Sequence, residues 1–181
     1  MKKILIGFIL TVCTISINAQ ETSNTEIEKA VSTKNYLYKE EVFSLNNIPA
    51  FRIDAVKVTN IEKFNTTNGL RVIHWIRIGK ELKSFYNYID ANEIDGLITA
   101  LQYINTVVKS KTTPDNYTEI KYNSQSGFQL KLASVLNLQN KLDWSFIVQT
   151  NTANNNTVVT LTIDEIDKLS KTFQQAKSKF Q

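Results

Sequence analysis

Apolar and polar residues alternate along much of the chain, as expected for β-strands that are buried on one face only. The clearest case is residues 70–78, where successive side chains point to opposite faces. One face of this stretch carries Leu70, Val72, His74, Ile76 and Ile78. The same criterion predicts strands at 35–45, 51–58, 82–89, 117–123, 128–135, 142–150 and 157–163.

Residues that favour turns lie between the predicted strands. Pro49 ends the first strand, because it cannot donate a backbone hydrogen bond. Asn68-Gly69 and Ser126-Gly127 predict turns, and residues 79–81 predict a short hairpin loop. The Asn-rich stretch 151–156 predicts an exposed loop between the last two strands.

The apolar spacing changes twice to the period of a helix. The first stripe consists of Ile94, Leu97, Ile98, Leu101, Ile104 and Val108. The second consists of Ile166, Leu169, Phe173, Ala176 and Phe180. Asp90-x-x-Glu93 and Thr162-x-x-Glu165 precede the two stripes, and each predicts a capping box at the helix start.

The pattern therefore repeats as four strands followed by a helix. It predicts an α+β fold of mainly antiparallel sheet, with one half at 36–110, a linker at 111–116 and a second half at 117–181, all in one compact domain. The segments Glu93-Ile-Asp-x-Leu and Glu165-Ile-Asp-x-Leu support a duplication with this register. A rival register aligns residues 63–70 with residues 121–128 and makes the first half one strand shorter.

This order of elements resembles the duplicated sheet-and-helix plan of the Whirly-type proteins, which bind single-stranded nucleic acid. The resemblance covers the order of elements only, so it implies a fold and carries over no site residue.

The N-terminus has the composition of a secretory signal peptide at residues 1–19. Lys2 and Lys3 precede an apolar run that is too short to span a bilayer, and Ala19 is the expected cleavage position. This predicts an exported protein in the periplasm, outer envelope or medium. Two alternatives are a buried N-terminal strand and a lipoprotein anchored through Cys13, although Val12 fits a lipobox poorly. Residues 20–35 predict a flexible lead-in with a helical turn near 27–31.

Composition argues against several function classes. The net charge is +4 and falls to +2 without the two N-terminal lysines, so binding to nucleic acid is not expected. His74 is the only histidine and Cys13 the only cysteine, so we expect no metal centre and no other cofactor. No second apolar run is long enough for a transmembrane helix, and no nucleophile elbow or Gly-rich phosphate loop is present.

Two groups of residues remain as candidate sites. The carboxylates Glu93, Asp95, Glu165 and Asp167 could form acid–base pairs of an enzyme, but helix capping accounts for their positions. Aromatic and basic residues on the predicted strands offer an interaction surface for a protein or glycan partner. The candidate surface consists of Tyr86, Tyr88, Trp75, Arg71 and Arg77. The sequence therefore predicts a non-catalytic binding module, with an enzyme or a nucleic-acid-binding or glycan-binding protein as alternatives.

Overall fold

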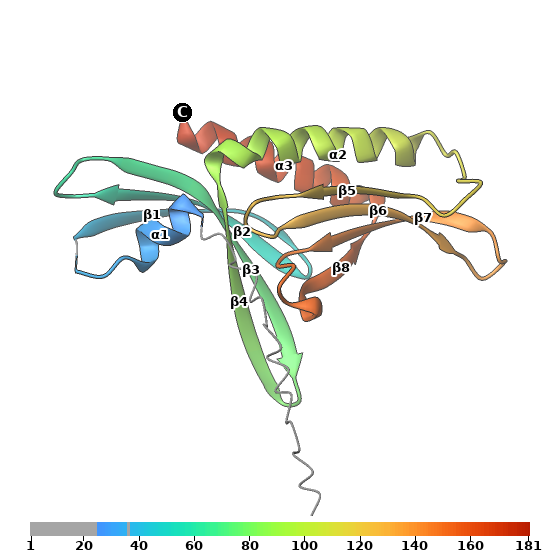
Figure 1. Cartoon of the computed structure of the whole chain (residues 1–181), viewed down its shortest axis with the longest axis horizontal. Helices are drawn as coiled ribbons and strands as arrows, with labels where there is room; N and C mark the ends of the chain where they lie inside the picture. Colours follow the sequence, from blue (N-terminus) through green and yellow to red (C-terminus); the bar gives the residue numbers. More distant parts are fainter. Residues whose placement is uncertain (1–24, 36) are drawn as a thin grey trace, which may run out of the picture.

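The computed structural model describes residues 25–35 and 37–181. The predicted signal peptide, its cleavage site and Cys13 lie outside the described residues. The described part contains two antiparallel four-stranded sheets and three α-helices, which confirms the α+β class (Figure 1). None of its helices combines the length and the apolar character that crossing a bilayer requires.

The first sheet has the strand order β1-β2-β3-β4 and the second has the order β5-β6-β7-β8, so neighbours in sequence are neighbours in space. The first sheet consists of β1 (Tyr38–Ile48), β2 (Phe51–Asn60), β3 (Thr66–Ile78) and β4 (Glu81–Asp90). The second consists of β5 (Glu119–Asn123), β6 (Gln129–Leu136), β7 (Leu142–Gln149) and β8 (Val158–Leu161). The α-helices are α1 (Glu26–Ser32), α2 (Ile94–Lys109) and α3 (Ile163–Phe180), and two short 3₁₀ helices are η1 (Ala91–Glu93) and η2 (Asn155–Thr157).

Each long helix packs on the sheet that it does not follow in sequence. Helix α2 follows the first sheet but contacts β5 and β6, whereas α3 follows the second sheet and contacts β1 and β2. The two helices also contact each other along their lengths (Figure 1). Because each sheet is covered by the helix of the other half, neither half can bury its apolar face alone.

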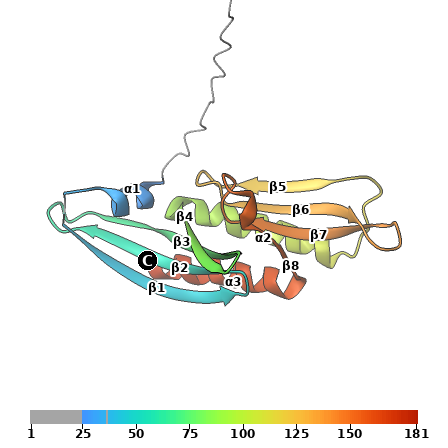
Figure 2. The same ribbon diagram turned by 90° about the horizontal axis from the view of Figure 1, so that it is seen from below.

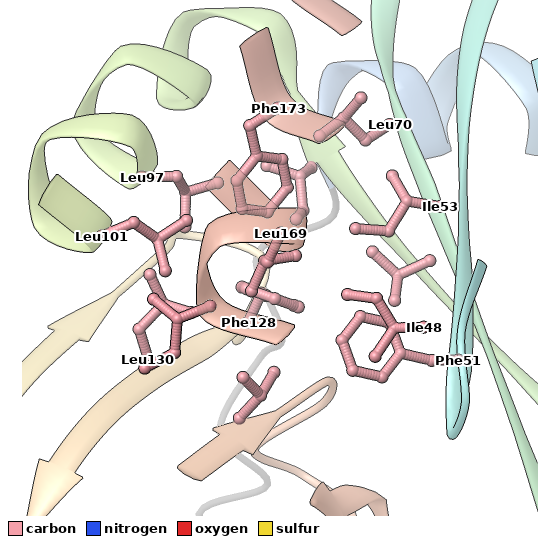
Figure 3. Close-up of a cluster of buried hydrophobic side chains, with 14 of the residues drawn as sticks. Ile48, Phe51, Ile53, Leu70, Leu97, Leu101, Phe128, Leu130, Leu169 and Phe173 are labelled. Atoms are coloured by element: carbon pink, nitrogen blue, oxygen red, sulfur yellow. The ribbon is translucent and has the colours of Figure 1, made fainter. Parts of the chain in front are cut away.

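A single large core joins the two halves. Leu97 and Leu101 of α2 and Leu169 of α3 are fully buried in it, and their side chains converge on those of both sheets (Figure 3). The rings of Phe128 and Phe173 meet edge to face, with their centroids 6.1 Å apart and an interplanar angle of 84°. This is a preferred geometry for aromatic pairs, and it joins the start of β6 to α3.

The predicted turn at Asn68-Gly69 is wrong, because both residues lie inside β3. They pair with Lys57 and Val56 of β2, and the chain reverses earlier, at residues 61–64. Gly69 is needed for close packing instead. A Cβ built there would lie 2.7 Å from the carbonyl oxygen of Ile89 and 2.8 Å from Cγ2 of Ile27. The glycine lies where a backbone and a side chain approach closely, which is a common reason for glycine within a strand.

Only one of the two predicted capping boxes forms. At the start of α3, the Thr162 backbone N–H donates to Glu165 Oε2 at 2.7 Å, and the Glu165 N–H donates to Thr162 Oγ1 at 3.4 Å. At Asp90 the prediction is wrong, because the chain continues into η1 and the Asp90 side chain does not cap it. The Asp90 carboxylate accepts the N–H groups of Glu26 and Ile27 instead, at 2.9 and 3.0 Å. It therefore holds the start of α1, more than sixty residues away in sequence.

Helix α1 docks onto the first sheet, where the sequence predicted only a helical turn. Thr25 caps it by accepting the N–H of Glu28 at 3.2 Å. Ile27 is fully buried against Val56 and Val58 of β2. The helix thus covers one end of the face of the first sheet that points away from the main core.

Candidate binding surface on the first sheet

The pairing of β3 with β4 brings all five predicted surface residues onto one face. Arg71 lies opposite Tyr88, and Ile73 lies opposite Tyr86. Trp75 and Arg77 follow on the same side of β3, because side chains two positions apart share a face. The other side of these strands carries Leu70, Val72 and Ile89, which lie in the main core. We call the opposite side, with Trp75 and Tyr86, the outer face.

The register also adds residues of β2 that sequence reasoning missed. Arg52 pairs with Ile73 and Asp54 pairs with Arg71, so both belong to the outer face. Their alternation along 51–58 was visible in the sequence. Which strand they would lie beside was not, because register depends on long-range pairing.

A buried carboxylate organises the middle of the outer face. Asp54 has no exposed surface, and its Oδ2 accepts hydrogen bonds from Arg52 Nη2 at 3.0 Å and Arg71 Nη2 at 3.1 Å. Its Oδ1 accepts the Ser44 hydroxyl at 3.2 Å. Arg71 Nη1 donates in turn to Glu40 Oε1 at 3.2 Å. We call these residues the Asp54 cluster, in which two arginines balance the charges of two carboxylates.

The electrostatics follow from this balance. Burial alone lowers the pKa of Arg71, but the hydrogen bond and the charge of Asp54, with Glu40, outweigh it and the net shift is upward. Burial raises the pKa of the neighbouring Tyr88 hydroxyl, and the Arg71 guanidinium partly opposes that shift. Arg71 is therefore a fixed cation with its charge compensated inside the protein.

The Asp54 cluster supports an exposed tryptophan. The Arg52 guanidinium carbon lies 5.9 Å from the centre of the Trp75 ring, within range of a cation–π contact. Asp54 holds Arg52, and Arg52 in turn holds one side of the indole. Trp75 is 40% exposed despite this contact, so part of its ring remains available to a ligand.

The exposed part of the outer face lies on the hairpin of β3 and β4, which projects beyond the body of the protein (Figure 1). Tyr86 is 54% exposed and accepts a hydrogen bond from the Ser84 hydroxyl at 3.4 Å. Leu82, which lies opposite Arg77, is 64% exposed. Gly79, with φ of +62°, allows the tight loop at the tip.

Two of the five predicted residues have mainly structural contacts. Tyr88 packs against the small cluster that α1 forms on the sheet, and Arg71 belongs to the Asp54 cluster. The remaining three, Trp75, Arg77 and Tyr86, are exposed on the hairpin. The structure therefore separates a supporting part of the outer face from an accessible part.

The four candidate carboxylates lie at separate places. Glu165 caps its own helix, Asp95 pairs with Lys177, and Asp167 pairs with Lys109. Glu93 is nearly buried, and its Oε1 accepts the backbone N–H of Gln125 at 2.5 Å. Burial raises the pKa of Glu93, as does the nearby Asp90 charge, whereas backbone N–H groups of Gln125 and Asp90 oppose the shift. Three of the four carboxylates therefore join separate elements of the fold, and Glu165 caps its own helix.

His74 lies on the inner face of β3 and is 6% exposed. Burial lowers its pKa, which favours the neutral imidazole. Within residues 25–35 and 37–181, no group of three or more histidine, cysteine, aspartate or glutamate side chains is placed to hold a metal ion.

Comparisons with known proteins add no functional assignment: no protein-family model matches the chain, and no curated protein sequence matches it.

Proposed function

We propose that this chain is an exported, non-catalytic binding protein that holds a protein partner on the projecting outer face of the β3–β4 hairpin. The observation that carries the proposal is the group of exposed Trp75, Tyr86 and Arg77 side chains on one face of two paired strands. Tryptophan, tyrosine and arginine are the residues most enriched at the energetic centres of protein interfaces.

The support beneath Trp75 favours binding as the role of this surface. The Asp54 cluster limits the movement of Arg52 and so restricts the indole. A side chain that is already ordered loses less conformational entropy when a partner covers it. The apolar surface of Leu82 continues the patch toward the tip of the hairpin, where a partner could cover it together with the aromatic rings.

The charges on this face favour protein over nucleic acid. Asp54 and Glu40 compensate two of its arginines, Arg52 and Arg71. Affinity for nucleic acid depends on uncompensated cations that displace counterions from phosphates, and such cations are few here. A glycan could stack on Trp75 or Tyr86, and the experiment below distinguishes that case.

Export rests on the order of basic, apolar and polar residues in 1–19. Mass spectrometry of the protein from its producing cells tests it. A chain that starts at Gln20 supports simple cleavage, whereas a lipid-modified Cys13 would make the protein an anchored lipoprotein.

The duplication and the Whirly-like plan remain part of the proposal. They are supported by the two four-stranded sheets, each followed by a long helix, and by the sequence Glu-Ile-Asp-x-Leu shared by the two helix starts. A common plan of this kind accounts for the architecture and implies no shared ligand.

Photo-crosslinking at the hairpin tests the proposed function. A photoreactive phenylalanine analogue replaces Tyr86, and a second protein carries it at Phe64, which is 84% exposed in the turn between β2 and β3. We expect a defined protein adduct from position 86 only. Trp75→Ala should abolish this adduct without changing the melting temperature, whereas Leu138→Ala, in the loop between β6 and β7, should leave it intact.

Equal labelling from positions 64 and 86, or an adduct that survives Trp75→Ala, would contradict the proposal. Release of the bound material by glycosidase or nuclease, and not by protease, would show that the ligand is a glycan or a nucleic acid.

A further inference from the structure

One edge of the second sheet lies at β5. Within residues 25–35 and 37–181 this strand pairs with β6 alone, and it forms the outermost strand of the sheet (Figure 2). An unpaired edge strand exposes a row of backbone N–H and C=O groups that can pair with another strand.

The hydrogen bonds at the two ends of β5 show which residues face this edge. Ser134 N–H donates to the Thr118 carbonyl at 2.9 Å, and Ser124 N–H donates to the Phe128 carbonyl at 2.8 Å. The even-numbered residues of the strand therefore direct their backbone groups toward β6. In an antiparallel ladder the direction alternates, so Glu119, Lys121 and Asn123 direct theirs outward.

An apolar groove lies directly beside this edge, between β5 and α2. Its volume is about 570 Å³. Its apolar lining includes Gly96, Ala100, Tyr103, Ile104, Ile120 and Tyr122. Tyr103 is 59% exposed at the rim of the groove. Free backbone groups beside an apolar groove are the two features that accept an added β-strand.

The sequence of β5 is complementary to itself when two copies run antiparallel. If a twofold axis passes through Ile120, then Glu119 lies opposite Lys121 of the second copy, and Lys121 lies opposite Glu119. Both residues direct their backbone groups outward, so each of these pairs can exchange its N–H···O bonds. Opposite charges placed across two strands stabilise the pairing.

The neighbouring register is electrostatically poor. An axis through Lys121 also satisfies the backbone groups, but it places Lys121 opposite its own copy, and directly opposed like charges destabilise a sheet. In the favoured register Ile120 meets Ile120 on the side of the groove, with Thr118 opposite Tyr122. The apolar contacts and the charge pairs thus select the same axis.

We infer that this protein forms a homodimer in which the β5 strands of two copies pair antiparallel about Ile120 and join their second sheets into one continuous sheet. Glu119 already pairs with Lys121 and Lys131 within its own chain, and Tyr117 donates a hydrogen bond to it at 2.5 Å. Pairing across the axis extends these contacts of Glu119 into a network of ion pairs that two copies share. The surface is separate from the hairpin, so a dimer presents two copies of the outer face to a partner.

Sedimentation velocity over a concentration series tests the dimer with charge variants of the purified protein. We expect the wild type to shift from monomer to dimer as concentration rises. Lys121→Glu places glutamate opposite glutamate on both sides of the axis, and it should weaken association by about tenfold or more. Combining it with Glu119→Lys restores opposite charges and should restore the dimer.

Lys83→Glu is the matched control, because Lys83 forms the same kind of exposed pair with a glutamate two residues earlier, on β4. It should dimerise like the wild type. A wild-type protein that stays monomeric at every concentration, or a Lys121→Glu variant that dimerises like the wild type, would overturn the inference.

A cysteine substitution reports the register. With Cys13 replaced by serine, Ile120→Cys places two thiols on the axis, in a non-hydrogen-bonded pair whose Cα atoms are about 4.5 Å apart, which suits a disulfide. We expect rapid oxidation to a covalent dimer. Leu138→Cys, at a residue that is 99% exposed, should oxidise much more slowly. Equal rates for the two variants would contradict the proposed axis.

Discussion

Lys177, near the end of α3, donates hydrogen bonds to both carboxylate oxygens of Asp95, in the first turn of α2, at 2.7 and 3.0 Å. The reciprocal contact joins Lys109, at the end of α2, to Asp167, in the first turns of α3, at 3.2 and 3.3 Å. Each acid lies near the positive end of its helix and each lysine near the negative end of its own. The two contacts therefore orient a pair of antiparallel helices.

These ion pairs should contribute little to stability, because their side chains are largely exposed. We expect Asp95→Asn to lower the free energy of unfolding by less than about 1 kcal/mol. The loss should shrink further at high salt, since exposed charges are screened. Urea unfolding at two ionic strengths measures this change in the free energy of unfolding. Lys177→Gln and the double variant complete a mutant cycle, which gives the coupling energy of the pair. A large loss that salt does not change would indicate that Asp95 has another structural role.

Asp54 should be far more important than the exposed acids. Asp54→Ala leaves two arginines without their buried anion. We expect it to lower the free energy of unfolding by about 3 kcal/mol, at the lower end of the range for buried pairs, because both arginines retain some contact with water. Asp143→Ala, at an exposed position on β7, is the control and should be nearly neutral. Urea unfolding compares them, and equal losses would contradict the role assigned to the Asp54 cluster.

Gly69→Ala tests the docking of α1. The added methyl would clash with the Ile89 carbonyl and with Ile27. We therefore expect the free energy of unfolding to fall by about 1–3 kcal/mol, as it does when a core is overpacked. Limited proteolysis should then cut within α1 faster than in the wild type. Ile27→Ala removes one of the two clashing groups, so the double variant should lose less than the sum of the single losses. Strict additivity would mean that the two residues do not clash.

Glu93 should make stability depend on pH. Burial raises its pKa in the folded protein above the ordinary value of 4.5, so the fold favours the protonated form. Wild-type stability should therefore fall as pH rises from about 4.5 through the raised pKa. Glu93→Gln keeps an oxygen to accept the Gln125 N–H but cannot ionise.

The Glu93→Gln variant should consequently gain stability over the wild type as pH rises through that window, and the gain should level off above it. Thermal unfolding at a series of pH values measures the difference. A constant difference at all pH values would show that ionisation of Glu93 does not affect the fold.

Local patterns were enough to predict most of the elements. The alternation in residues 70–78 and 142–150 and the helical stripes that begin at Ile94 and Ile166 match β3, β7, α2 and α3. Thr162-x-x-Glu165 also forms its capping box, because that motif needs only residues within one helical turn. The five surface residues were predicted by type and lie on one face because period-2 alternation and hairpin pairing are local properties.

The errors have a common physical cause. Asn68-Gly69 has the composition of a turn, but Ile27 and the β4 backbone crowd that position, so the glycine serves packing. Asp90 has the spacing of a cap for its own helix, but its carboxylate satisfies the free N–H groups of α1. In both cases a partner distant in sequence took the place of the local one.

By itself, the sequence determined the class of fold, the positions of the strands and long helices, and the chemistry available on each face, because hydrophobic periodicity and helix caps act over a few residues. Only the tertiary structure decided that each long helix covers the other half's sheet and that Asp54 meets two arginines beneath Trp75. It alone also placed the edge of β5 beside an apolar groove. These relationships depend on which distant surfaces pack together. The free energy of that packing comes from contacts between elements far apart in the sequence, so a short segment does not determine it.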